Sequence, residues 1–102
     1  MALKVAFLFV APEANPASHR AVVATPAVEV TTVGAPSYAE AERVARALVE
    51  EGIAAIELCG GFGNEGVARI ARAVAGKAAV GAVRFDCHPG LEFKSGDAIF
   101  GQ

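Results

Sequence analysis

The sequence has no tryptophan, only two cysteines and no long uninterrupted apolar run. Two cysteines are too few for the disulfide framework of a small secreted domain, so Cys59 and Cys87 are expected to be reduced thiols. No stretch approaches the roughly 18 apolar residues that a membrane-spanning helix needs, so no membrane partner is expected. Together these absences favour a cytoplasmic protein.

Clustered positive charge is also missing. The chain has nine lysines and arginines against eleven acidic residues, a net charge of −2, and its basic residues are scattered. Binding to nucleic acid needs clustered cations that contact phosphates, so nucleic acid is not expected to be a partner. The apolar N-terminal segment follows a single lysine and precedes no small-residue cleavage site, so it is interpreted as a buried strand rather than a signal peptide.

What the sequence does contain is a high apolar fraction. Of its 102 residues 54% are hydrophobic and 20% are charged, which is enough for one packed domain spanning 1–102. A chain this apolar often hides part of its surface against another copy. The composition therefore predicts a homo-oligomer.

Apolar runs alternate with amphipathic segments along the chain. The spacing predicts strands at 3–10, 28–33, 53–58 and 79–85, and helices at 16–25, 38–51 and 64–75. Asn15 and Pro16 have the residue types that begin a helix, and Ser37 with Glu40 has the spacing of a capping box. The tail from Leu91 onward is expected to hold a short strand at 97–100 or to form a flap.

This β-α-β-α-β-α-β order predicts an α/β fold with mostly parallel strands. Two architectures agree with it: a small open four-stranded sheet with helices on both faces, flavodoxin-like, or half of an eight-stranded barrel completed by a second chain. The open sheet is favoured because no helix clearly follows the fourth strand.

Polar side chains gather where the predicted strands end. Ligands of parallel α/β sheets bind at this edge. The candidates are Glu13 and His19 after the first strand, Glu57 and Cys59 at the end of the third, and Arg84, Asp86, Cys87 and His88 at the end of the fourth. This clustering predicts a site for a small polar or anionic molecule, in which Arg84 pairs with Glu57 or clamps a negative group.

A glycine-rich loop joins the third strand to the third helix. Gly60, Gly61 and Gly63 precede Asn64, where the helix is expected to begin. Free backbone N–H groups at a helix N-terminus attract an anion or a developing oxyanion, so this loop is predicted to hold the ligand. Alternatively, the glycines serve only a tight turn and close packing.

The same loop matches a dinucleotide fingerprint in its spacing. Gly61, Gly63 and Gly66 occupy the three glycine positions, and Asp86 follows twenty residues later. The fingerprint normally follows the first strand, however, and Glu65 places a negative charge where a pyrophosphate would lie. Dinucleotide binding is therefore kept as an alternative, and the sequence identifies no cofactor.

The segment 83–90, with the sequence VRFDCHPG, provides the groups for acid–base chemistry. His88 could transfer a proton, and Asp86 could orient its imidazole. Cys87 is adjacent in sequence but points to the opposite face of a strand, so Cys59 is the better thiol partner for His88. The alternative is that each cysteine is a small buried apolar residue and that His88 fixes a loop.

These side chains also include types that bind metals. Cys59, His88, Asp86, His19 and Glu57 are chemically competent ligands. They would have to come from separate strands, and no dense motif such as a Cys-x-x-Cys pair is present. No metal site is therefore predicted.

With FLFVAPEA, IELCGGFGNEGVARIA and VRFDCHPG in view, the chain resembles a family of short bacterial proteins, about 100 residues long, of unknown function. Members of that family carry similar ELCGGFG and RFDCHPG segments, and the resemblance covers nearly the whole chain. It implies a stand-alone domain, and it brings no reaction, cofactor or catalytic residue with it.

The sequence thus predicts a small enzyme that acts on a small polar or anionic metabolite by an isomerase, lyase or hydrolase step. The catalytic candidates are His88, Asp86, Cys59 and Cys87. The alternative is a non-catalytic small-molecule-binding module or an oligomeric accessory protein.

Overall fold

The structure is a computed structural model that describes residues 1–83, 85 and 87–101. In this part of the chain the elements are β1 (Leu3–Val10), β2 (Arg20–Ala24), β3 (Val28–Ala35), α1 (Tyr38–Glu50), β4 (Ala55–Leu58), α2 (Asn64–Val74), β5 (Ala79–Ala82), the 3-10 helix η1 (Pro89–Leu91) and α3 (Gly96–Phe100). None of the helices in the described ranges is long and apolar enough to cross a bilayer.

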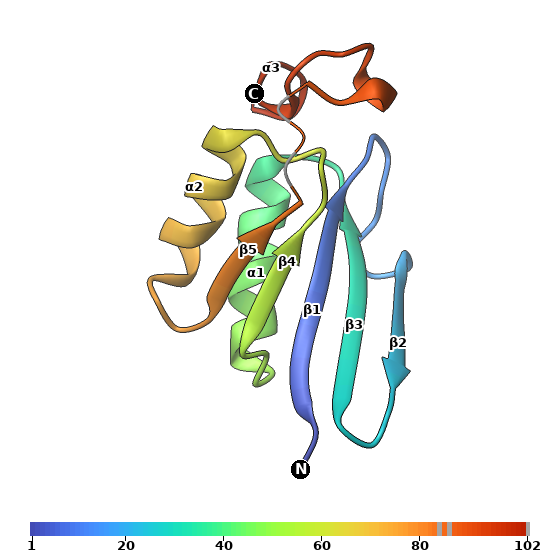
Figure 1. Ribbon diagram of the computed structural model, residues 1–102, viewed down its shortest axis with the longest axis vertical. Helices are drawn as coiled ribbons and strands as arrows, with labels where there is room; N and C mark the ends of the chain where they lie inside the picture. The colour runs from blue at the N-terminus through green and yellow to red at the C-terminus, as the bar shows by residue number, and fades with distance from the viewer. Residues whose placement is uncertain (84, 86, 102) are drawn as a thin grey trace.

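The five strands form an open mixed sheet in the order β2-β3-β1-β4-β5 (Figure 1). β1 pairs in parallel with β3 and β4, and β4 pairs in parallel with β5. At one edge, β2 runs antiparallel to β3. The predicted α/β class with an open, mostly parallel sheet is confirmed, and the antiparallel edge strand is added to the four predicted strands.

The segment 16–25, predicted as a helix, is a single turn followed by β2. Asn15 does cap a turn, because its side-chain oxygen accepts the N–H of Ala17 at 2.9 Å. The imidazole Nδ1 of His19 accepts the N–H of Asn15 at 2.8 Å and closes that turn. Val22 and Val23 then favour extended backbone, because β-branched side chains lose freedom in a helix. The helix prediction is wrong because the capping signal extends over one turn only.

Both helices that connect parallel strands lie on one face of the sheet (Figure 1). The chain steps from β3 to β4 through α1 and from β4 to β5 through α2, in the same direction across the sheet. Right-handed crossovers in one direction place their helices on the same face. The chain differs here from the flavodoxin-like expectation, and α1 and α2 leave the other face of the sheet uncovered.

The core lies between this layer of helices and the sheet. Its largest fully buried side chains are Tyr38, Phe62, Leu8, Leu48, Ile56, Leu58, Ile70 and Val33. The capping prediction for α1 is confirmed, since the Ser37 hydroxyl accepts the N–H of Glu40 at 3.2 Å. The predicted stop is confirmed as well, because Gly52 follows the helix with a φ of 94°, a left-handed conformation that glycine adopts readily.

Residues 89–101 form a C-terminal strap across the rim, which is the sheet edge where the parallel strands end (Figure 1). Segment 97–100 lies in α3 and is not a strand. The reason is a local cap, in which the Ser95 hydroxyl accepts the N–H of Asp97 at 3.1 Å. Phe100 belongs to the buried core, so α3 is anchored in the body of the domain.

Candidate functional site

The glycine loop and the segment that ends in His88 meet at the rim. A Cβ atom placed on Gly60 would lie 2.4 Å from Cδ2 of Phe85 and 2.9 Å from Cδ2 of His88. Both rings therefore rest directly on the Gly60 backbone. Their centroids are 5.1 Å apart, in a tilted arrangement that aromatic rings favour.

Cys59 lies at the start of the same loop, directly after β4. Its Sγ accepts the N–H of Gly61 at 3.3 Å and that of Val10 at 3.5 Å. The side chain is half-buried and packs against the core. The His88 ring therefore lies against Gly60 and the Cys59 sulfur against Gly61, with Cys59 directly after β4 and His88 in the segment after β5.

The imidazole of His88 is held in place by its own turn. Its Nδ1 accepts the N–H of Gly90 at 2.9 Å, and its backbone oxygen accepts the N–H groups of Leu91 and Phe93. Because Nδ1 acts as an acceptor, the neutral ring carries its proton on Nε2. The turn thus fixes both the orientation and the tautomer of this histidine.

The N-terminus of α2 is occupied by a carboxylate from the strap. Asp97 accepts the N–H of Glu65 and the N–H of Gly66, each at 3.0 Å. The N-cap residue of α2 is Gly63, whose lack of a side chain leaves no local cap. The sequence predicts a bound ligand anion at this helix start, and in the structure the Asp97 carboxylate lies there.

Tyr38 links the strap to the glycine loop. Its hydroxyl donates to Asp97 at 2.9 Å and accepts the N–H of Gly63 at 2.9 Å. The ring is fully buried and stacks on Phe62, with centroids 5.4 Å apart. The guanidinium carbon of Arg69 lies 5.6 Å from the centre of the ring, a cation–π distance.

Glycine is required where the strap contacts the loop. A Cβ atom on Gly96 would lie 1.7 Å from the backbone oxygen of Gly61, and one on Gly63 would lie 2.5 Å from the Asp97 carboxylate. The N–H groups of Gly61, Phe62 and Gly63 donate to Cys59 or to Tyr38. The glycines therefore serve close packing here, and the loop amides are engaged by the chain's own atoms.

The electrostatics of this contact keep Asp97 ionised and Tyr38 neutral. Burial alone would raise the pKa of Asp97, but the N–H groups of Glu65 and Gly66 and the Tyr38 hydroxyl outweigh it and lower the pKa below the ordinary value of 3.8. Burial raises the pKa of Tyr38 well above its ordinary value, and the neighbouring Asp97 adds to the rise. The phenol therefore remains a donor at neutral pH.

The strap contact should weaken in acid. The native state holds the Asp97 proton less tightly than the unfolded chain, so the carboxylate stabilises the fold above about pH 4, and this stabilisation is lost as the pH falls through the lower native pKa. Urea unfolding of the wild type and of Asp97→Asn across this pH range measures the effect. The difference between their free energies of unfolding should shrink with acidification; a difference independent of pH would contradict this assignment.

The other predicted site residues are spread more widely. Cys87 is exposed, and Asn64 is the exposed first residue of α2. Glu57 is exposed within β4, on the face that the helices leave uncovered. Glu13, with a φ of 64°, and His19 lie in the connection between β1 and β2.

Two predicted residues, Arg84 and Asp86, lie outside the described residues. The proposed Arg84–Glu57 pair and the orienting role of Asp86 remain predictions. Sequence reasoning missed Tyr38 and Asp97. The available signals were a single tyrosine at the start of a helix and a capping-type serine two residues before an aspartate in the tail.

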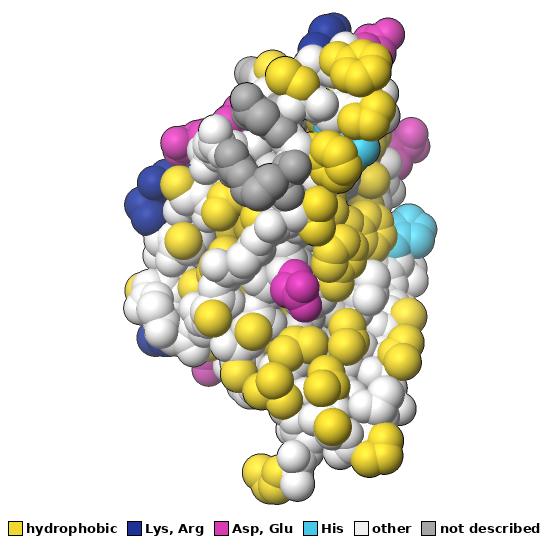
Figure 2. Space-filling view, viewed as in Figure 1, with side chains coloured by type: hydrophobic (Ala, Val, Ile, Leu, Met, Phe, Trp, Pro, Cys, Tyr) yellow, Lys and Arg dark blue, Asp and Glu magenta, His cyan; other side chains and the backbone are white. Residues whose placement is uncertain are grey.

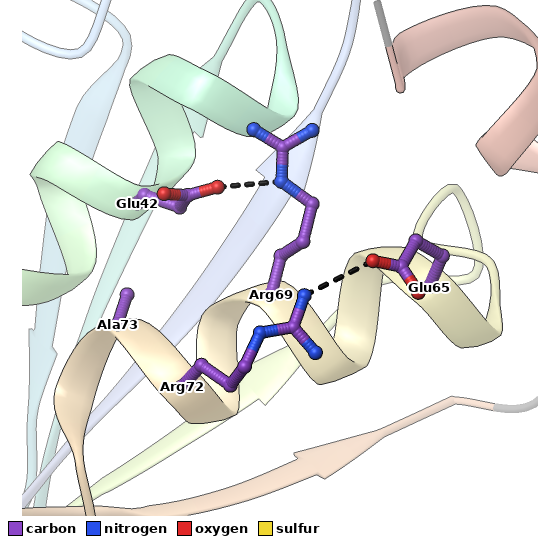
Figure 3. A pocket seen from close by; sticks show the side chains of 5 residues that line it. All are labelled: Glu42, Glu65, Arg69, Arg72 and Ala73. Carbon is purple, nitrogen blue, oxygen red and sulfur yellow. Dashed lines mark hydrogen bonds and ion pairs between the residues drawn. The ribbon is translucent and has the colours of Figure 1, made fainter.

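A groove of about 450 Å³ lies between α1 and α2 and is lined by Glu42, Glu65, Arg69, Arg72 and Ala73. Figure 3 shows Arg69 paired with Glu42 and Arg72 paired with Glu65, at 2.5 and 3.0 Å. Its charges thus compensate one another, and the groove is a set of ion pairs between two helices.

Among the described residues, no group of three or more His, Cys, Asp and Glu side chains is arranged to hold a metal ion. Residues 3–98 match a family model described as a family of unknown function, DUF6506. No curated protein and no solved structure matches the chain significantly.

Proposed function

The chain belongs to the DUF6506 family, whose function is unknown, and we propose that it acts on a small polar or anionic metabolite by acid–base chemistry at the rim. The observation that carries this proposal is the contact of His88 with Gly60, which joins two segments far apart in sequence. Cys59, which precedes Gly60 in the chain, supplies a thiol to the same loop.

In this proposal His88 transfers the proton. With Nδ1 accepting the N–H of Gly90, Nε2–H can donate a hydrogen bond to the ligand; for Nε2 to accept a proton, the ring must carry its own proton on Nδ1 and release Gly90. Cys59 lines the site or attacks the ligand as a nucleophile. These roles suit isomerase, lyase or hydrolase steps, in which a proton moves to or from a carbon or oxygen next to a polar group.

The ligand is placed beside Gly60 and not at the start of α2. Asp97 already neutralises the N-terminus of α2, so a second anion there would first have to displace the strap. Beside Gly60 the ligand would instead meet the rings of Phe85 and His88, which rest on that backbone, and the hydrogen bonds of Asp97 would stay intact. The strap then acts as a fixed wall of the site.

Proton exchange in D₂O tests the proposal. The full chain is mixed with a panel of 2-oxo acids, hydroxy acids and sugar phosphates, and deuterium incorporation is followed by NMR. His88→Gln is expected to slow the exchange of a reactive panel member by at least about 100-fold, because a positioned general acid–base contributes that much. Glu92→Gln, an exposed acidic residue of the strap, is the matched control and should exchange like the wild type.

The outcomes distinguish the two functional classes. Exchange that depends on His88 supports an enzyme. Binding without exchange, detected as a thermal shift, would instead favour the non-catalytic binding module. A chain that neither binds nor exchanges any panel member contradicts both.

A further inference from the structure

The face of the sheet opposite α1 and α2 is apolar and bears no described helix (Figure 1). Figure 2 views this face, and hydrophobic side chains and backbone make up most of its middle. Val23 and Leu3 are 63% and 53% exposed there, although valine and leucine usually lie inside. A single exposed valine is ordinary, but here Val23 and Leu3 adjoin the half-buried Val30 and Phe7 of the same face, so the apolar surface is continuous.

The strand register orders this face into rows that cross all five strands. The first row consists of Val23, Val30, Val5, Ala55 and Ala79. The second row consists of Ala21, Thr32, Phe7, Glu57 and Gly81. The first row is entirely apolar, and the second has one polar side chain on each side of Phe7.

The face is large enough for a partner. Its five strands contain 29 residues by their bounds, 8 + 5 + 8 + 4 + 4. With a strand spacing of about 4.8 Å and a rise of about 3.3 Å, they cover roughly 460 Å² as a flat projection. Two such faces together give roughly 920 Å², which is the size of a weak or transient interface.

We propose that a second copy of this chain covers the face, about a two-fold axis that runs along β1. A half-turn about this axis leaves each residue at the same position along the strand direction. It places β3 of one copy opposite β4 of the other. Because β3 and β4 flank β1 with Thr32 and Glu57 both in register with Phe7, Glu57 then faces the partner subunit's Thr32. Phe7 packs against the partner's Phe7 on the axis.

This arrangement gives Glu57, the one charged residue in the two rows, a hydrogen-bond partner. A carboxylate enclosed in an apolar interface is costly unless it accepts hydrogen bonds. The hydroxyl of the partner's Thr32 donates such a bond, and the symmetry repeats it on the other side. Packed sheets cross at about 30°, which displaces a residue one strand from the axis by only about 2.4 Å, within reach of both side chains.

A charge-reversal series tests this pairing independently of the rim chemistry. Sedimentation velocity and native mass spectrometry of the full chain over a dilution series are expected to show a dimer. Thr32→Glu places a carboxylate opposite each Glu57 and should weaken association by at least about 100-fold. Thr32→Lys should retain the dimer, and the double change Thr32→Glu with Glu57→Lys should restore it. Ala47→Glu, on an exposed position of α1, is the control and should leave association unchanged.

Each alternative result overturns the proposal. A wild-type chain that remains monomeric throughout the series excludes the dimer. A dimer that Thr32→Glu leaves intact uses another surface, and so does a dimer weakened by Ala47→Glu. A failure of Glu57→Lys to rescue Thr32→Glu excludes an axis along β1. Circular dichroism of each variant confirms the fold, and Thr32→Lys gives a second reading if Thr32→Glu does not fold.

Discussion

Gly96→Ala is expected to lift the C-terminal strap from the rim and to lower the free energy of unfolding by about 2–4 kcal/mol. The added methyl group would lie 1.7 Å from the backbone oxygen of Gly61, and a backbone atom cannot rotate away as the end of a side chain can. The strap must therefore move, and Asp97 moves with it. The predicted loss combines overpacking with the loss of charge-assisted hydrogen bonds.

Two measurements check this result. Urea denaturation gives the free energy of unfolding, and hydrogen exchange reports the amides of Glu65 and Gly66, which should lose protection when Asp97 withdraws. Gly81→Ala is the matched control, because a Cβ atom there meets nothing within 4 Å. Unchanged protection of both amides in Gly96→Ala would show that the strap is not held by this contact.

Tyr38→Ala is expected to cost about 3–5 kcal/mol, the range for removing a large aromatic ring from a core. The change deletes a fully buried ring that stacks on Phe62 and lies beneath Arg69. It also leaves the N–H of Gly63 without its acceptor. Urea unfolding followed by far-ultraviolet circular dichroism measures the loss.

Tyr38→Phe separates the hydroxyl from the ring. It preserves the packing and removes only the bridge between Gly63 and Asp97, so its expected cost is smaller, about 1–3 kcal/mol. Combining it with Asp97→Asn gives a double-mutant cycle for that bridge. If Tyr38→Phe proved neutral, the bridge would contribute nothing to stability; if it matched Tyr38→Ala, the packing of the ring would contribute nothing.

Much of the fold could be predicted because its signals are local. The apolar stripe of α1, its Ser37 cap and its Gly52 stop all lie within a few turns of one another, and the structure confirms them. The same kind of local evidence failed at Asn15, where a good capping residue begins a turn and the β-branched Val22 and Val23 then extend. One cap cannot outweigh the preference of the residues that follow it.

The contact at the start of α2 could not be predicted for a different reason. The sequence predicts that the amides of the glycine loop hold a ligand, but the acceptor that bonds to the first amides of α2 in the structure is Asp97, 31 and 32 residues further along the chain. Tyr38 is 59 residues from Asp97. Which distant side chain reaches a helix end depends on the tertiary path of the tail, and no local pattern encodes that path.

The face of the sheet that each helix covers could be predicted only in part. Right-handed crossovers can be assumed from sequence, but which face each helix covers follows only from the strand order. The order β2-β3-β1-β4-β5 makes both crossovers run the same way, because the connection from β1 to β3 goes through an antiparallel strand instead of a helix. Segment 16–25 therefore affects the layers as well. Because it forms a turn and β2, the helix that was predicted there does not cover the second face of the sheet.

The capping of α2 by Asp97 has a consequence for synthesis on the ribosome. The first turn of α2 leaves the exit tunnel well before Asp97 does, and until then its amides and the hydroxyl of Tyr38 must be satisfied by water. Consider nascent chains held with the first turn of α2 outside the exit tunnel and Asp97 still inside it. Proteases should cleave these chains near residue 63 more readily than chains in which Asp97 has also emerged. Folding of the domain would thus be completed only after the Asp97 carboxylate has left the ribosome.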